Sequence, residues 1–317
     1  MKIGFLGAGV WGICLARILA LNGHEVIGWT RTDAHAREVN QTRRNPHLPD
    51  CILPDNVIYT HDMNKVLQGA EVIVEAVTSA GIRPVFELVK KISIKKGIPI
   101  VITSKGIEQN TCMTLPDVVL SVLEEVDPHF VLCLSGPGFA AEICKSLPTS
   151  VVVGGTSIDI ATDIARLFTT KFFRVYSNND LKGICLGGAL KNIIAIACGV
   201  SDGLQLGTGA RASLMTRGLH EIVRLASHYG AKKETLYGLS GMGDMFLTCS
   251  SEKSRNFRFG YLLSKGYSTE KAKTEIDMVV EGAYTAVSCM QMSKKFDLQM
   301  PITEAVLQVI DGVITPK

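Results

Sequence analysis

The residue with the greatest potential for chemistry in this sequence is Lys191. It lies in residues 186–199, LGGALKNIIAIACG, a helical pattern that is apolar on all sides apart from Lys191 and Asn192, as is typical of a buried helix. A lysine is rarely buried without a partner or a function, and burial lowers its pKa toward neutrality, where the ammonium can donate a proton. Gly187 and Gly188, one turn before Lys191, leave room for a small molecule. The pattern fits a catalytic lysine and a structural lysine equally well.

A glycine-rich hexapeptide near the N-terminus predicts a dinucleotide site. Residues 7–12, GAGVWG, lie between the apolar run 1–6 and the helix-forming residues 13–21, and a second predicted strand, 25–29, completes a βαβ unit. In this setting G-x-G-x-x-G gives a tight turn, lets a pyrophosphate approach the backbone, and places it at the positive end of a helix. The glycines expected at the dinucleotide are Gly7, Gly9 and Gly12, with Val10 between them in the same turn.

The residues after the second strand bear on the choice of cofactor. Arg31 comes first and favours the 2′-phosphate of NADPH, whereas Asp33 leaves NADH open because an acid there binds the ribose hydroxyls. A solvated loop charge is the alternative interpretation of Arg31. The cofactor is therefore predicted to be NADP or NAD, with NADPH slightly favoured.

Two loops after predicted strands could carry substrate-binding groups. Lys105 follows the strand 98–103, and ligands of an open α/β sheet bind beyond the carboxyl ends of its strands. The second loop, 134–142, contains Gly136 and Gly138 around a proline, and its backbone amides could hold a phosphate or a hydroxyl. Further strands are predicted at 71–77, 130–134, 150–154 and 172–176.

The pattern of the chain changes from α/β to largely α near residue 178. We therefore predict an N-terminal Rossmann-like, doubly wound sheet domain over residues 1–177 and an all-α substrate domain over 178–317. Within the second domain, His220 and His228 share one face of an amphipathic helix, and we interpret both as surface or packing residues because no strand end or glycine-rich turn surrounds them.

Two polar segments in the predicted helical domain could contribute to the site. Asp244 and Thr248 lie one turn apart after a glycine-rich turn, and the Asp244 carboxylate could hold the Lys191 ammonium or merely favour the helix dipole. Residues 254–256, Ser-Arg-Asn, precede another helix and combine a hydroxyl, a guanidinium and an amide at its N-terminus. That combination suits a phosphate, although simple capping is the alternative.

Composition excludes several classes of function. The 317 residues carry a formal net charge of +3, and basic residues do not alternate with aromatic ones, so no nucleic-acid partner is expected. The apolar N-terminus is interrupted by glycines, unlike a secretion signal, and no run is predicted to span a membrane. Nine cysteines without a C-x-x-C pair are typical of reduced, buried cytosolic thiols, so we predict neither disulfides nor a metal site.

In combination these motifs resemble the NAD(P)-dependent glycerol-3-phosphate dehydrogenases of the bacterial soluble, biosynthetic type. The matching segments cover almost the whole chain: GAGVWG, SKGIE at 104–108, GPGFAAE, ALKNIIAIACG, GLSGMGDMFLTC, SRNFRFG and VVEG. The chain departs from the family at Gly138, because members usually carry serine or threonine in the third position of GPxFA. A hydroxyl contact to substrate is therefore expected to be absent there.

The resemblance implies a reaction and a set of site residues. The reaction is the reversible reduction of dihydroxyacetone phosphate to sn-glycerol 3-phosphate, which supplies glycerophospholipid synthesis. Lys191 is implied as the general acid/base, assisted by Lys105 and Asp244. Substrate contacts are implied for Lys105, Gly136, Gly138, Lys191, Asp244, Ser254, Arg255 and Asn256, and cofactor contacts for Trp11, Arg31, Lys105, Ala140, Arg255, Val279 and Glu281. A cytoplasmic homodimer acting on a phosphorylated triose is also implied.

Two alternative functions fit the same architecture. A β-hydroxyacid or ketopantoate-type dehydrogenase would use Arg255 for a carboxylate instead of a phosphate. A dinucleotide-sensing regulator would need a basic DNA-reading helix or a partner surface, and the sequence has no such helix.

Overall fold

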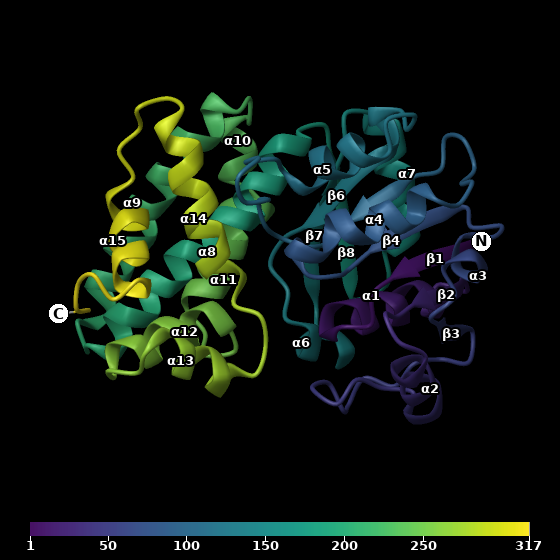
Figure 1. The fold of residues 1–317 in the computed structure, drawn as a ribbon, viewed down its shortest axis with the longest axis horizontal. Helices are drawn as coiled ribbons and strands as arrows, with labels where there is room; N and C mark the ends of the chain where they lie inside the picture. The colour runs from purple at the N-terminus through teal and green to yellow at the C-terminus, as the bar shows by residue number, and fades with distance from the viewer. Residues whose placement is uncertain (317) are drawn as a thin grey trace. The chain divides into compact units, whose positions relative to one another are not determined.

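The computed structural model describes residues 1–316. The N-terminal part of the chain forms a large sheet covered by helices (Figure 1). The eight strands lie in the order β3-β2-β1-β4-β5-β6-β7-β8. Pairing is parallel from β3 through β6 and again between β7 and β8. Its first six strands therefore have the order of a doubly wound dinucleotide-binding sheet, as the sequence predicted. The strands are β1 (Lys2–Leu6), β2 (Glu25–Trp29), β3 (Val57–Thr60), β4 (Val72–Glu75), β5 (Ile100–Ile102), β6 (Val131–Ser135), β7 (Thr149–Gly154) and β8 (Phe173–Asn178).

The helices between these strands cover the sheet because the strands are apolar on both faces. β4 and β6 are buried along their whole length, which is the pattern of a parallel sheet packed on two sides. α1 contributes most of its residues to the core of this unit. The helices are α1 (Val10–Leu21), α2 (Asp33–Thr42), α3 (Met63–Leu67), α4 (Ile82–Lys90), α5 (Leu115–Val122), α6 (Ala140–Cys144) and α7 (Ile158–Phe168).

The remainder of the chain is helical and has a core of its own. Its centre is α8 (Leu181–Gly203), whose residues from Leu186 to Cys198 are almost all buried. The other helices are α9 (Gly207–His228), α10 (Lys233–Leu236), α11 (Asp244–Cys249), α12 (Arg255–Ser264), α13 (Thr269–Ile276), α14 (Glu281–Lys294) and α15 (Pro301–Ile310), with a π-helical turn, η3 (Leu239–Gly243), before α11. His220 and His228 both lie on the exposed side of α9, consistent with a surface role.

The structure corrects the expectation that no segment is long and apolar enough to cross a membrane. By length and composition alone, the 23 residues of α8 would qualify. However, 94% of its most apolar 18 residues are buried inside the protein. A helix that is apolar all round is also what the core of a large domain requires, and this explains its composition.

Close packing of α8 on α12 depends on glycines. A Cβ at Gly199 would lie 1.9 Å from the carbonyl oxygen of Phe257, and a Cβ at Gly260 would lie 2.0 Å from the carbonyl oxygen of Ile196. Both obstacles are backbone atoms, so no side-chain rotation relieves the clash.

We therefore expect Gly260→Ala to lower the free energy of unfolding by about 3 kcal/mol, the upper end of ordinary overpacking costs. Urea unfolding followed by circular dichroism measures the effect. Gly209→Ala in α9 is the matched control, because a Cβ there meets nothing within 4 Å and alanine is the better helix former. Equal unfolding midpoints for the two variants would contradict the packing argument.

Two compact units emerge, and two short segments of the sheet region group with the helical unit. The first unit comprises Met1–Ser104, Leu115–Leu134 and Gly138–Leu181, and the second comprises Lys105–Thr114, Ser135–Pro137 and Lys182–Lys317. A single domain boundary at residue 177 does not account for the two short segments, 105–114 and 135–137, that group with the helical unit. They matter for function because they place Lys105 and Gly136 in the same unit as Lys191.

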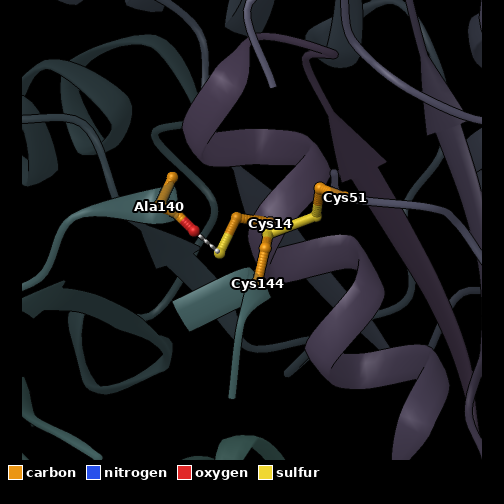
Figure 2. The surroundings of a disulfide bond; sticks show 4 residues. All are labelled: Cys14, Cys51, Ala140 and Cys144. Atoms are coloured by element: carbon orange, nitrogen blue, oxygen red, sulfur yellow. Dashed lines mark hydrogen bonds between the residues drawn. A yellow bond between two sulfur atoms is a disulfide. The ribbon is translucent and has the colours of Figure 1, made fainter. Parts of the chain in front are cut away.

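The structure also corrects the prediction that all nine cysteines are reduced. Cys51 and Cys144 form a disulfide across 93 residues of sequence, with their Cα atoms 5.3 Å apart (Figure 2). The other seven cysteines are buried and form no disulfide in the described residues. The bond ties the loop before β3 to the last residue of α6, and the Cys14 thiol of α1 donates a hydrogen bond to the Ala140 carbonyl at the start of the same helix. Sequence spacing could not reveal this pair because the fold alone brings the two residues together.

Candidate active site

The glycine turn after β1 has the geometry that a pyrophosphate site needs. Gly7 has a φ of +114°, and a Cβ there would lie 2.6 Å from the Ala76 carbonyl oxygen, so only glycine fits. A Cβ at Gly9 would meet nothing within 4 Å, which leaves open space at the N-terminus of α1. Gly9 offers no side chain to cap the helix, so the first amides of α1 are available to an anion. These residues fit a dinucleotide.

A second group of predicted cofactor residues surrounds this turn. A Cβ at Gly138 would lie 3.6 Å from the Trp11 ring and 3.2 Å from Ile143, so the GPG loop packs beside Trp11 of the GAGVWG motif. Ala140 begins α6 directly after it. The structure thus brings Trp11, Gly138 and Ala140 together within the first unit. A Cβ at Gly138 would require only a small shift of the flexible end of the Ile143 side chain, so the structure leaves room for a serine there.

Arg31 and Asp33 differ in what they contact. Asp33 forms an ion pair with Arg37 at 2.5 Å, lies 3.1 Å from His61 Nδ1, and is in the first turn of α2. Arg31 is exposed, and in the described chain it has no ion pair or side-chain hydrogen bond. Asp33 is therefore committed to its own helix, whereas the Arg31 guanidinium is free to meet a ligand.

Lys191 lies at the centre of a buried polar cluster in the second unit. Its ammonium donates to Asp244 Oδ1 at 2.6 Å and to Thr248 Oγ1 at 2.5 Å. Lys105 approaches the other side of the same carboxylate, 2.5 Å from Asp244 Oδ2, and also donates to the Gly136 carbonyl at 3.1 Å. Lys191 is 6% exposed and Asp244 only 1%. The sequence had left two roles open for Asp244, and the structure pairs it with both lysines.

The hydrogen bonds of the cluster leave donors available for a ligand. The Thr248 hydroxyl donates to the Asp244 backbone carbonyl at 2.6 Å, so toward Lys191 it acts as an acceptor. An ammonium group has three donors. Two donors of Lys191 are used, and Lys105 likewise has two partners within the described residues. Each lysine therefore retains one N–H for an oxygen of a substrate.

The electrostatics of the cluster suit a proton donor. Burial lowers the pKa of Lys191 to about 8, the Asp244 carboxylate opposes that shift, and the positive charge of Lys105 reinforces it. Two cations share one anion, so the cluster carries a net positive charge that attracts an anion. An acid with a pKa near the working pH is well matched to general acid–base catalysis.

Local backbone features place Asp244 opposite Lys191. The π-helical turn η3 ends immediately before Asp244, and such turns are frequent at functional sites. A Cβ at Gly187 would lie 3.0 Å from the Ser240 carbonyl oxygen and 3.1 Å from the Gly241 Cα. The lack of side-chain bulk before Lys191, which the sequence suggested as room for a ligand, is thus used at Gly187 for the close approach of η3.

The predicted phosphate-binding residues form a second cluster at the start of α12. Ser254 caps the helix by accepting a hydrogen bond from Phe257 N at 3.2 Å, but its hydroxyl hydrogen remains able to donate. The Arg255 guanidinium donates to the Val279 carbonyl at 3.0 Å, and Glu281 lies close enough to influence its pKa. The residues predicted from the SRN and VVEG motifs are therefore neighbours.

Asn256 connects this cluster to the helix of Lys191. Its side-chain oxygen accepts from Gly282 N at 2.9 Å, and a Cβ at Gly282 would lie 2.7 Å from both that oxygen and the carbonyl oxygen of Asn192. Asn256 therefore has a structural bond as well as its predicted role. The two clusters meet where α8, α12 and α14 approach one another.

Two residues at the lysine cluster were missed as site residues from the sequence. Thr248 was noted only for its spacing from Asp244, yet it contacts Lys191 directly. Ser135 is buried, its hydroxyl has no hydrogen-bond partner among the described residues, and it lies where a Cβ on Gly188 would come within 2.4 Å of it. Ser135 lies within the loop 134–142 that was predicted to bind substrate, but only the glycines of that loop were named, because Ser135 is also the last residue of the predicted strand's extension.

A doubly wound sheet with a dinucleotide turn, followed by a helical unit with a buried lysine paired to a carboxylate, is the architecture of a nicotinamide-dependent dehydrogenase. Residues 2–161 match the N-terminal and residues 180–317 the C-terminal domain of the NAD-dependent glycerol-3-phosphate dehydrogenases. The chain belongs to the NAD-dependent glycerol-3-phosphate dehydrogenase family.

Relatives support this assignment along the whole chain. The chain is 53% identical over 315 residues to the glycerol-3-phosphate dehydrogenase [NAD(P)+] of Protochlamydia amoebophila, covering 99% of this chain and 94% of that protein. It is 48% identical to the corresponding protein of Chlamydia abortus, covering 98% and 92%. The crystal structure of glycerol-3-phosphate dehydrogenase from Coxiella burnetii superposes with a TM-score of 0.94 at 36% identity, covering 99% and 96%.

Proposed function

We propose that this protein reversibly reduces dihydroxyacetone phosphate to sn-glycerol 3-phosphate with NAD(P)H, with Lys191 as the general acid/base. The observation that carries the assignment of Lys191 is its burial on Asp244 with a pKa lowered to about 8. We further propose that residues 1–177 form the dinucleotide-binding domain and residues 178–317 the helical substrate domain, with single residues of each contributing to the other's ligand. Membership of the family supports the reaction and the use of NAD or NADP.

The chain's own residues account for the proton in this reaction. When bound, the reduced nicotinamide supplies the hydride that reaches the carbonyl carbon. Lys191 uses its remaining N–H to donate a proton to the substrate oxygen as negative charge develops there, and Lys105 orients the same oxygen. Asp244 holds both ammonium groups in position, and its charge raises the pKa of Lys191 enough to keep it mostly protonated at pH 7. In the reverse direction the neutral Lys191 amine accepts the proton.

The cluster of Ser254, Arg255 and Asn256 would hold the substrate phosphate. The N-terminus of α12 offers backbone amides, and a guanidinium can bind phosphate through two parallel hydrogen bonds. We propose that Arg255 and Glu281, with Val279, also contact the cofactor. Gly136 and Gly138 would contribute backbone groups to the substrate.

An assay with paired substrates and cofactors tests the function. We expect oxidation of NADPH or NADH, followed by absorbance of the reduced nicotinamide, with dihydroxyacetone phosphate but not with ketopantoate or other 2-keto acids. Turnover only with a keto acid would favour the β-hydroxyacid alternative, and tight NADPH binding without any turnover would favour a sensor. Because Arg31 is free and Asp33 is paired, NADPH should be preferred, and Arg31→Ala should reduce that preference.

The phosphate handle predicts a specific response to Arg255→Leu. We expect kcat/KM for dihydroxyacetone phosphate to fall by about 100-fold or more, because binding energy from the phosphate also orients the carbonyl. Dihydroxyacetone, which lacks the phosphate, should be a poor substrate for the wild-type enzyme and should lose much less activity in the variant. Steady-state kinetics with both substrates measure this difference. An equal loss for both substrates would show that Arg255 does not act through the phosphate.

The phosphorylated triose is the partner that the enzyme class requires. The finer proposals are a cytoplasmic homodimer without a nucleic-acid partner, supported by the family resemblance and the small net charge. The Cys51–Cys144 disulfide is the one observation that argues against a cytoplasmic location, because disulfides are rare in reducing compartments. Trapping free thiols by alkylation in intact cells, followed by mass spectrometry of these two residues, tests the location.

A further inference from the structure

Glu75 is a buried acid to which the mechanism above gives no role. It is the last residue of β4 and is 0% exposed. Parallel strands end at one edge of the sheet, so Glu75 lies next to the ends of β1 and β5, with which β4 pairs. A fully buried acid at this edge calls for a physical explanation.

The contacts of the Glu75 carboxyl group favour a neutral acid over a carboxylate. Its Oε1 accepts from Val77 N at 2.5 Å and lies 2.7 Å from the Ser104 hydroxyl, which also lies within hydrogen-bond distance of the Val77 carbonyl. A single hydroxyl hydrogen cannot bond well to two acceptors. The other carboxyl oxygen, Oε2, is buried without a partner among the described residues, so ionisation would leave negative charge on an unsolvated atom.

One added proton resolves this conflict. If Glu75 is a neutral acid, it donates through Oε1 to the Ser104 oxygen, Ser104 donates to the Val77 carbonyl, and Val77 N donates to Glu75 in return. Every hydrogen in this ring then has one acceptor. Burial raises the pKa of Glu75 to about 8, opposed by hydrogen bonds from Ser104, Val77 and Thr103, and charged side chains are not among the causes. Both lines of argument give the neutral form at pH 7.

The ring stabilises the backbone on which two predicted site regions depend. Val77, which belongs to the ring, directly follows Ala76. The Ala76 carbonyl packs so closely on Gly7 of the dinucleotide turn that a Cβ at Gly7 would lie 2.6 Å from it. On the β5 side, Thr103 donates to the Glu75 carbonyl through both its amide and its hydroxyl. Ser104 is followed directly in the chain by Lys105.

We propose that Glu75 is a positioning residue that works as a neutral acid, closing a hydrogen-bond ring that fixes the ends of β4 and β5, from which Lys105 emerges. The positioning of Lys105 for catalysis rests on the proposed function, whereas the neutral state of Glu75 does not. Glu75→Gln is the diagnostic variant, because it keeps the shape of the side chain and never carries a charge, and its amide oxygen can accept from Val77 N while Ser104 donates to that oxygen or to the Val77 carbonyl.

Thermal unfolding as a function of pH tests the neutral state independently of activity. The pKa of Glu75 is higher in the folded protein than in the unfolded chain, so the wild-type protein loses stability as pH rises from about 4.5 to about 8. The Tm of Glu75→Gln minus that of the wild type should therefore be lowest near pH 4.5, rise by several degrees up to pH 8, and then level off. Glu25→Gln is the matched control, because Glu25 is exposed at the start of β2. A constant difference across this range would overturn the neutral state.

Kinetics with dihydroxyacetone phosphate test the positioning role. Glu75→Gln should keep kcat within about twofold of the wild type at pH 7, whereas Glu75→Ala and Ser104→Ala should lower it by about tenfold or more through misplacement of Lys105. Wild-type kcat in both alanine variants would refute positioning, as would an equal loss in Glu75→Gln and Glu75→Ala. If no variant and not even the wild type turned over this substrate, the proposed function would fail, while the Tm comparison would still decide the state of Glu75.

Discussion

Replacing Lys191 by methionine should lower kcat for dihydroxyacetone phosphate reduction by about 1000-fold or more while leaving a folded protein that binds NADPH. The methionine side chain keeps the length of lysine and fits the apolar surroundings of α8, so the fold should be preserved. The reaction loses both its proton donor and one of the two cations beside the developing negative charge. General acid catalysis and electrostatic stabilisation each contribute factors of about 100 or more.

Three measurements separate this loss of chemistry from a loss of structure. Circular dichroism reports folding, NADPH fluorescence reports cofactor binding, and single-turnover absorbance reports hydride transfer. Lys233→Met is the matched control, since Lys233 is exposed in α10 of the same unit and the substitution should leave kcat unchanged. If Lys191→Met retained kcat within about tenfold of the wild type, Lys191 would be a structural lysine, the alternative that the sequence left open.

The parts of the fold that sequence could predict are those set by local pattern. Continuous apolar runs and a glycine turn located β1, β2, β4 and the strands that follow them. β3 was missed because its residues 57–60, VIYT, are a short run after a proline-rich loop, with alternating burial that gives little signal in four residues. The boundary signal near residue 178 likewise could not show that residues 105–114 and 135–137 group with the helical unit.

The candidate site divides in the same way. Lys191 could be predicted as a site residue because a charged residue within an apolar helical segment is recognisable from the sequence alone. The glycines of the dinucleotide turn could be predicted because they form a contiguous motif. The contacts of Thr248, the ring around Glu75 and the Cys51–Cys144 bond join residues that are distant in sequence or have unremarkable neighbours. Such contacts depend on the register and packing of separate elements, which local propensity does not encode.

Asp244→Asn should have the second largest effect, and it should change the pH dependence as well as the rate. In the wild-type enzyme the reduction needs protonated Lys191, so kcat for reduction should fall as pH rises through about 8, while kcat for glycerol 3-phosphate oxidation should rise over the same range. The Asp244 carboxylate is the main influence that raises the pKa of Lys191. Removing its charge leaves Lys105 and Lys191 without their common counterion, so the pKa of Lys191 should fall further.

A lower pKa of Lys191 in Asp244→Asn determines how the pH profile of kcat should change. The break in the reduction profile should move below pH 8, and at pH 7 kcat for reduction should drop by about 100-fold, because fewer Lys191 side chains carry a proton and both lysines lose their anchor. Thr248→Val is the matched control: it removes the other acceptor of Lys191 without changing charge, so it should lower kcat by about tenfold and leave the break closer to its wild-type position. If the reduction profile of Asp244→Asn kept its break at pH 8, the titrating acid would not be Lys191. The pKa of Lys191 must respond to the loss of the negative charge that it contacts directly.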